Sequence, residues 1–150
     1  MGTGNWGILT WQRICGGVLR YDDGTPDSNY RVVMHWVGAS FAILNNCSVY
    51  VYKRENGSNV YTAGSQGNFY HPGGLNFPGV WHKWRFSVVD DDCGVGAIKA
   101  EIQWNGNWYT AIEYRDPDPL PAGRAGVYIG TQNTRNVSID DIKIQSLSYT

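Results

Sequence analysis

The chain carries almost no net charge. Its 150 residues hold 12 Lys and Arg against 13 Asp and Glu, a formal net charge of −1. Because nucleic acids and anionic membranes are recognised mainly by basic surfaces, we expect neither as a partner. The sequence also lacks an apolar run long enough to span a membrane, and the polar start Met1-Gly2-Thr3-Gly4 lacks the apolar segment of a signal peptide.

Patterns for metal binding and catalysis are equally scarce. Cys15, Cys47 and Cys93 are too widely spaced for a zinc site, which needs a Cys-x-x-Cys pair. One disulfide with a leftover thiol and three free thiols both remain open. The histidines have no metal-ligand spacing, and no Gly-x-Ser-x-Gly nucleophile motif occurs. We therefore expect no catalytic residues, although a lyase that uses a tyrosine and a histidine as base and acid stays open.

Aromatic residues and glycine are abundant instead. The chain has 7 Trp, 10 Tyr, 19 Gly and 6 Pro, a composition typical of β-proteins, and no segment shows the 3.6-residue apolar period of a helix. At this length a single domain buries enough surface to fold without a metal or a disulfide. With no internal repeat and no linker, residues 1–150 are expected to form one β-sandwich domain, cut from a larger multidomain protein.

The C-terminal third contains the clearest strands. Apolar and polar residues alternate over 98–104 and again over 108–115, and Asn105-Gly106 between them predicts a hairpin with a type I′ turn. The prolines between Asp116 and Pro121 predict a loop, because proline removes a ladder hydrogen-bond donor. Short strands are expected at 127–129 and 137–147.

These segments carry a family resemblance, which covers residues 81–147. Its motifs are Trp81-His82-Lys83-Trp84-Arg85-Phe86-Ser87-Val88, the hairpin Ile102-Gln103-Trp104-Asn105-Gly106-Asn107-Trp108, then Pro121-Ala122-Gly123-Arg124-Ala125-Gly126-Val127-Tyr128, and Val137-Ser138-Ile139-Asp140-Asp141-Ile142-Lys143-Ile144. The order resembles the closing strands of the concanavalin A-like (laminin-G-like) jelly-roll sandwiches of lectins and carbohydrate-binding modules. The resemblance implies an all-β, antiparallel β-sandwich of the concanavalin A-like jelly-roll type.

The N-terminal half predicts further strands. We expect them at 5–14 and 17–21, separated at Gly16-Gly17, and at 30–37, 40–44, 48–53 and 60–63. Residues 64–79 form the longest irregular segment and are rich in aromatics, so we expect a functional loop there. By strand alternation Tyr30, Val32 and Met34 share one face, with Arg31, Val33 and His35 on the other. Four tryptophans are assigned to the core: Trp6, Trp36, Trp84 and Trp104.

A sugar site needs aromatic faces that stack on the ring and polar groups that bond its hydroxyls. If Val49 and Val51 point into the sandwich, strand alternation presents Tyr50, Tyr52 and Arg54 to solvent side by side. The predicted carbohydrate-binding residues are Tyr50, Tyr52, Arg54, Tyr61, Tyr70, His71 and Trp108. For the first three, a binding surface and an ordinary exposed strand stay equal alternatives, since most aromatics of a sandwich are structural.

A structural calcium ion is implied by the resemblance. Many jelly-roll modules hold calcium with a carboxylate of the last strand, and Asp140 in the Asp-Asp-Ile motif is similar to that position. Calcium takes six to eight oxygen ligands, so Asp140 would need main-chain carbonyls and the acidic loop of Asp22 and Asp23. The competing interpretation is a pair of solvated carboxylates that protects an edge strand.

The expected function is a non-catalytic carbohydrate-binding module or lectin-like domain that binds a polysaccharide or oligosaccharide. Laminarinase-type sandwich hydrolases carry Glu-x-Asp-x-x-Glu, whereas Glu55, Glu101 and Glu113 are isolated here. A laminin-G-like protein-recognition domain, or a small glycoside hydrolase or polysaccharide lyase, remains an alternative. The Asn-x-Ser sequons at Asn46, Asn56 and Asn136 are consistent with secretion, and we expect an extracellular or cell-surface location. We also expect a monomer.

Overall fold

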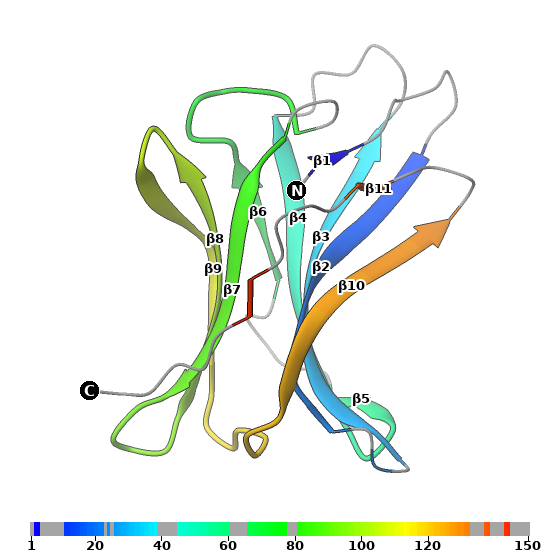
Figure 1. The fold of residues 1–150 in the computed structure, drawn as a ribbon, viewed down its shortest axis with the longest axis vertical. Helices are drawn as coiled ribbons and strands as arrows, with labels where there is room; N and C mark the ends of the chain where they lie inside the picture. Colours follow the sequence, from blue (N-terminus) through cyan, green and yellow to red (C-terminus); the bar gives the residue numbers. More distant parts are fainter. Residues whose placement is uncertain are drawn as a thin grey trace.

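The protein is built from antiparallel β-strands arranged in two main layers (Figure 1). The computed structural model describes residues 2–3, 11–22, 24, 26–38, 45–60, 66–77, 81–132, 137–138 and 143–144. No helix occurs among these residues, and so none that is long and apolar enough to cross a membrane. The expectation of an all-β protein with two antiparallel sheets is confirmed.

The larger sheet has six strands. Its order is β10 (Arg124–Gln132), β2 (Trp11–Asp22), β3 (Ser28–Gly38), β4 (Asn46–Glu55) and β5 (Ser58–Val60), and β6 (Gln66–Tyr70) also pairs with β4. The smaller sheet contains β7 (Lys83–Asp90), β8 (Gly96–Trp104) and β9 (Asn107–Asp116). A short ladder joins β1 (Gly2–Thr3) to β11 (Val137–Ser138). The two main sheets form a sandwich-like arrangement.

The Asn-Gly hairpin lies where the sequence predicts it. Asn105 and Gly106 join β8 to β9 with φ angles of 48° and 79°, the two positive values that a type I′ turn requires. Asn56 and Gly57 make the same kind of turn between β4 and β5, with φ angles of 49° and 78°. Both turns match the right-handed twist of their strands, so these two hairpins have a local cause.

Two expectations about strand boundaries are wrong. The chain does not break at Gly16-Gly17, since β2 runs through both glycines. Gly17 faces the smaller sheet, where a Cβ atom would lie 2.7 Å from the Phe86 ring, so glycine serves the close approach of two layers rather than a turn. Residues 66–70, expected in a loop, form β6 along β4. The expected strands at 5–10, 40–44, 61–63 and 139–142 lie outside the described residues.

The strict alternation expected in the return strand is also wrong. The pairing of β8 with β9 shifts register between Ala100 and Glu101, which pair with Ile112 and Thr110 respectively. Ala111 is therefore the extra residue of a β-bulge, and the face of the strand reverses there. Ile112 points into the core, whereas Trp108 pairs with Gln103 on the outer face.

The core lies between the two sheets. The larger sheet contributes side chains from β2, β3 and β4, and Val32, Met34 and Val49 are fully buried. The smaller sheet contributes Ile98, Ala100, Ile102 and Ile112, with half-buried Trp84 and Phe86 packed against them. Cys15 and Cys47 are buried in this core, while Cys93 is exposed at the β7–β8 turn. Of the two arrangements left open by the sequence, the structure has the one in which no disulfide joins Cys15, Cys47 and Cys93.

One end of the sandwich is closed by a buried polar network. Asp116, at the end of β9, pairs with Lys53 Nζ of β4 at 2.9 Å and accepts a hydrogen bond of 2.6 Å from the Tyr30 hydroxyl of β3. Asp116 and Lys53 are only 3% and 4% exposed. Lys53 also donates to the carbonyl of Asp118, and the amide of Leu120 donates to Tyr30 Oη at 3.0 Å. The network therefore ties the loop after β9 to the opposite sheet.

The ionisation of Asp116 is part of this contact. Burial acts to raise the pKa of Asp116, but hydrogen bonds from Tyr30, Lys53 and the Asp118 amide, with the charge of Lys53, outweigh it and lower the pKa below its ordinary value. The stability that the ionised carboxylate contributes is fully present above its unfolded-state pKa of about 3.9. It is lost as the pH falls through the lower folded-state pKa.

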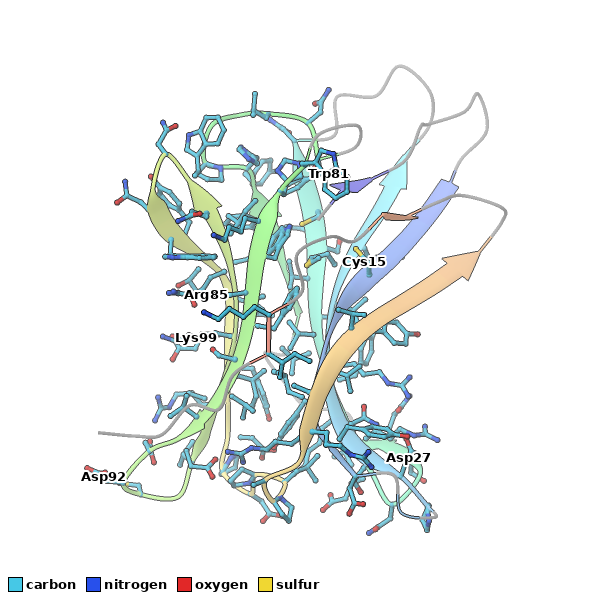
Figure 2. The ribbon with its side chains drawn as sticks, in the orientation of Figure 1. Cys15, Asp27, Trp81, Arg85, Asp92 and Lys99 are labelled. Carbon is cyan, nitrogen blue, oxygen red and sulfur yellow. The ribbon has the colours of Figure 1, made fainter. Side chains whose placement is uncertain are left out.

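We expect Asp116→Asn to lower the free energy of unfolding by about 3–5 kcal/mol, because the charge of Lys53 would stay buried without its partner. Urea denaturation at pH 7 measures the change. Asp92→Asn is the matched control, since Asp92 is exposed at the β7–β8 turn (Figure 2) and should leave stability unchanged. A loss below about 1 kcal/mol for Asp116→Asn would show that the network is dispensable.

Candidate functional site

Strand β4 presents Tyr50, Tyr52 and Arg54 on its outer side, as the sequence predicts. Val49 and Val51 are 0% and 2% exposed and face the core, whereas Tyr52 is 41% exposed. Tyr50 and Arg54 are partly exposed on the same side. The alternation that buries the two valines therefore places the three polar side chains on the face turned away from the smaller sheet.

Two tyrosines form a stacked pair on that face. The rings of Tyr50 and Tyr52 lie 5.7 Å apart with an interplanar angle of 12°. They come from positions i and i+2 of one strand, so the strand itself holds them parallel. Burial by neighbouring side chains, followed by the nearby Tyr50 and Tyr128 rings, raises the pKa of Tyr52, which keeps its hydroxyl protonated and neutral at pH 7.

The stacked pair forms one wall of a cavity on the outer face of the larger sheet. The cavity, here called the tyrosine hollow, has a volume of about 280 Å³. Its lining residues come from β3, β4, β5 and β10 and are Arg31, Val33, His35, Tyr50, Tyr52, Asn59 and Tyr128. None of them is an Asp or a Glu.

The strand register explains why a hollow exists there. Tyr128 of β10 pairs with Gly16 of β2, Gly16 pairs with Val33 of β3, and Val33 pairs with Tyr50 of β4. A large aromatic therefore stands at each end of this row, with a glycine and a short side chain between them. Three interstrand spacings separate the two tyrosine backbones, a span of about 14 Å. The middle of the row is the floor, and the aromatics are the walls.

Arg31 brings a positive charge into the tyrosine hollow. It pairs with Tyr52 across the strands, and its guanidinium lies 5.1 Å from the centre of the Tyr128 ring. Its Nε donates to Asn29 Oδ1 at 3.2 Å. The salt bridges among the described residues do not include one to Arg31. The side chain is thus held by an amide and a ring rather than by a carboxylate.

His35 adds a neutral polar group. Its ring lies 6.2 Å from that of Tyr50, and its Nε2 is buried with no hydrogen-bond partner. Burial lowers the pKa of His35, because the charged imidazolium loses its hydration. An unsatisfied buried nitrogen costs free energy, so a ligand that reached Nε2 would gain by forming a hydrogen bond to it.

Arg54 does not line the hollow. Its Nε is bonded to Asp27 Oδ1 at 2.9 Å, and its Nη1 reaches Asn59 Oδ1 at 3.5 Å. The guanidinium of Arg54 is the first cause that lowers the pKa of Asp27. This ion pair holds the Arg54 side chain at Asp27, the residue just before β3 (Figure 2 labels Asp27), and the second contact of Arg54 helps to position Asn59 of the hollow. Arg54 is therefore a neighbour of the site rather than a member.

The other predicted sugar contacts are not brought to the hollow. Tyr70 is 63% exposed but pairs with Asn46, four residues before Tyr50 along β4. His71 is 4% exposed and packs between Phe77, His82 and Trp104, so it is a structural residue of the loop that follows β6. Tyr61 lies outside the described residues.

Trp108 lies on the opposite side of the molecule. The guanidinium of Arg85 sits 4.2 Å from its ring centre, on the outer face of the smaller sheet (Figure 2 labels Arg85 and Lys99 there). Arg85 also pairs with Glu101 through two contacts of 2.5 and 2.9 Å, and Lys99 lies 3.8 Å from Glu113. Glu101 and Glu113 are thus both paired with cations.

For calcium, the described residues offer little. Asp22 is exposed at the end of β2, and its Oδ1 accepts a hydrogen bond of 3.0 Å from the amide of Gly24. Asp23 and Asp140 lie outside the described residues. In the part of the chain that is described, no group of three or more His, Cys, Asp or Glu side chains comes together as a metal site.

Five residues of the hollow are missing from the sequence-based site: Arg31, Val33, His35, Asn59 and Tyr128. Strand alternation does place Arg31 and His35 on one face of β3, but only the strand order shows that this is the face of Tyr50 and Tyr52. Tyr128 needs the pairing of β10 with β2, which joins segments about a hundred residues apart. The sequence does carry one usable signal. Arg31 and His35 of β3, like Tyr50 and Tyr52 of β4, alternate with core-facing residues and therefore lie on the outer face of the sheet.

Comparison with protein-family models, with curated proteins and with solved structures finds no match to this chain. The function is therefore argued from the geometry of the tyrosine hollow and from the chemistry of the side chains that line it.

We expect the imidazole of His35 to titrate below pH 6.5, because its buried Nε2 has no partner that would stabilise the charged form. NMR titration of the histidine ring protons measures the midpoint, and His35→Gln identifies the resonance. A midpoint above 6.5 would contradict the burial argument, since it would require an anionic partner for this ring.

Proposed function

We propose that the protein is a non-catalytic carbohydrate-binding module or lectin-like domain whose site is the tyrosine hollow. The observation that carries the proposal is the parallel pair Tyr50 and Tyr52, which forms an aromatic wall over a cavity of about 280 Å³. Sugar rings have flat apolar faces of C–H groups, and such faces pack on aromatic rings.

The polar lining supports the same ligand class. A sugar also has a belt of hydroxyls that need donors and acceptors in the plane of the ring. Arg31 supplies donors, Asn59 supplies both kinds, and His35 Nε2 is unsatisfied. When a ligand replaces the water of a shallow site, the gain in binding free energy is modest, so we expect dissociation constants in the micromolar-to-millimolar range.

The side chains that line the hollow support binding of a sugar without cleavage of its bonds. Glycoside hydrolysis needs a pair of carboxyl groups, and the lining of the hollow includes no Asp or Glu. The antiparallel two-sheet arrangement and the motifs at 81–147 support a concanavalin A-like jelly roll as the finer fold. A monomer at an extracellular or cell-surface location completes the proposal.

We expect Tyr52→Ala to weaken glycan binding by about tenfold, because half of one aromatic wall would be lost, a change equivalent to about 1.4 kcal/mol. A glycan array identifies the ligand, and affinity electrophoresis in gels that contain it measures retardation. Tyr109→Ala is the matched control, since Tyr109 is similarly exposed at 38% but belongs to the smaller sheet. Failure of the unmodified protein to retain any glycan, or equal retention by both variants, contradicts the proposal.

We also propose a structural calcium ion bound by Asp140 with Asp22 and Asp23. Calcium at about 100 times its dissociation constant should stabilise the fold by about 2.7 kcal/mol, because the ion binds only the folded chain. Thermal unfolding in calcium and in EDTA measures the shift, and Asp140→Asn should abolish it. Equal midpoints with and without calcium would leave the solvated-carboxylate interpretation in place.

A further inference from the structure

Arg31 places a guanidinium in the tyrosine hollow, and its contacts with the described residues use only part of its hydrogen-bonding capacity. Arg31 uses Nε for Asn29 Oδ1 and one face of its guanidinium for the Tyr128 ring. Hydrogen bonds from its two terminal nitrogens to other described residues are absent. Because the guanidinium is planar, these two nitrogens form a fork that fits the two oxygens of a carboxylate.

The nearest carboxylate on the same sheet is already occupied. After the hydrogen bond from Arg54, the charge of Arg31 is one of the causes that lower the pKa of Asp27. However, Asp27 Oδ1 is bonded to Arg54, and Asp27 Oδ2 accepts a hydrogen bond from Asn29 Nδ2 at 3.1 Å. Asn29 thus holds both Asp27 and Arg31, and it keeps the two side chains in place without joining them. The lining of the hollow thus contains the cation Arg31 and no acidic side chain.

We propose that the tyrosine hollow selects acidic sugars, an inference that rests on the proposed function. In this arrangement a uronic acid unit stacks on Tyr50 and Tyr52, and Arg31 pairs with its carboxylate. The carboxylate accepts two parallel hydrogen bonds from the terminal nitrogens of Arg31. His35 Nε2 forms a hydrogen bond to a hydroxyl of the same sugar, which satisfies the nitrogen that is buried without a partner. Arg31 is then the specificity residue, and His35 serves acidic and neutral sugars alike.

The choice of carboxylate over sulfate follows from the shape of the site. The Arg31 guanidinium, 5.1 Å from the centre of the Tyr128 ring, has two coplanar terminal nitrogens, which match the two coplanar oxygens of a carboxylate. Sulfate esters carry the same charge and can also bond the fork through two oxygens, but their tetrahedral group projects a third oxygen out of the plane of the fork. A sulfated polymer therefore belongs among the probes.

The test compares polymers that differ only in their acid groups. Polygalacturonate and alginate are used beside the same polymers after reduction of their carboxyl groups to alcohols, and dextran sulfate is the third probe. Affinity electrophoresis of the 150-residue chain should show at least about tenfold tighter binding to one of the acidic polymers than to its reduced form. Dextran sulfate should bind more weakly than that acidic polymer.

Four variants separate the roles of the residues. Arg31→Gln should remove the preference for the acidic form but keep the binding of the reduced form, and Arg31→Lys should restore only part of the preference because it has the charge without the fork. His35→Phe should weaken both forms equally. Arg85→Gln removes one positive charge from the smaller sheet and should leave the preference unchanged. Circular dichroism confirms that each variant is folded.

The outcomes are distinct. Equal binding of the acidic and reduced forms overturns the acidic-sugar inference and leaves carbohydrate binding intact. Stronger binding of dextran sulfate than of both uronate polymers overturns the choice of carboxylate. Loss of the preference in Arg85→Gln but not in Arg31→Gln moves the site to the smaller sheet and also overturns the inference. If no polymer is retained and the glycan array is empty, the proposed function fails together with it.

Discussion

The buried contact between Asp116 and Lys53 is the constraint on which the rest of the structure depends. It joins the last residue of β9 in the smaller sheet to β4 in the larger sheet, and Tyr30 of β3 completes it. Removing two charges from water is unfavourable unless each finds its partner, so this contact forms only when both sheets are in register. In the ladder, Tyr30 pairs with Lys53, and the next pair along the strands is Arg31 with Tyr52. The alternation that points the first pair inward points the second pair into the tyrosine hollow.

Much of the fold follows from local patterns. The hairpin at Asn105-Gly106 and the outward direction of Tyr50 and Tyr52 are set by turn chemistry and by alternation within single strands. The errors arose where tertiary contacts overrule a local pattern. The sequence pattern at Gly17 predicts a boundary between two strands, but the strand continues there, and the missing side chain makes room for Phe86 of the other sheet. Ala111 reads as an ordinary strand residue, yet as a bulge it reverses the face on which Trp108 lies.

The site was harder to predict than the fold, because it is assembled across strands. Tyr50 and Tyr52 could be predicted from β4 alone, whereas Tyr128, Arg31 and His35 join them only through the pairing of β10, β2, β3 and β4. His71 illustrates the opposite case. A histidine in an aromatic loop is typical of a binding site, but here the ring packs between Phe77, His82 and Trp104 and helps to close the end of the core.

The row from Tyr128 through Gly16 and Val33 to Tyr50 has a further consequence. Its two walls stand on strands of one hydrogen-bonded sheet, separated by two intervening strands. Their backbones cannot approach or separate unless ladder hydrogen bonds break, so the width of the opening can change only by rotation of the tyrosine side chains. A ligand that fits this preformed opening would bind with little loss of backbone conformational entropy, and one with a branch wider than the opening would fit poorly.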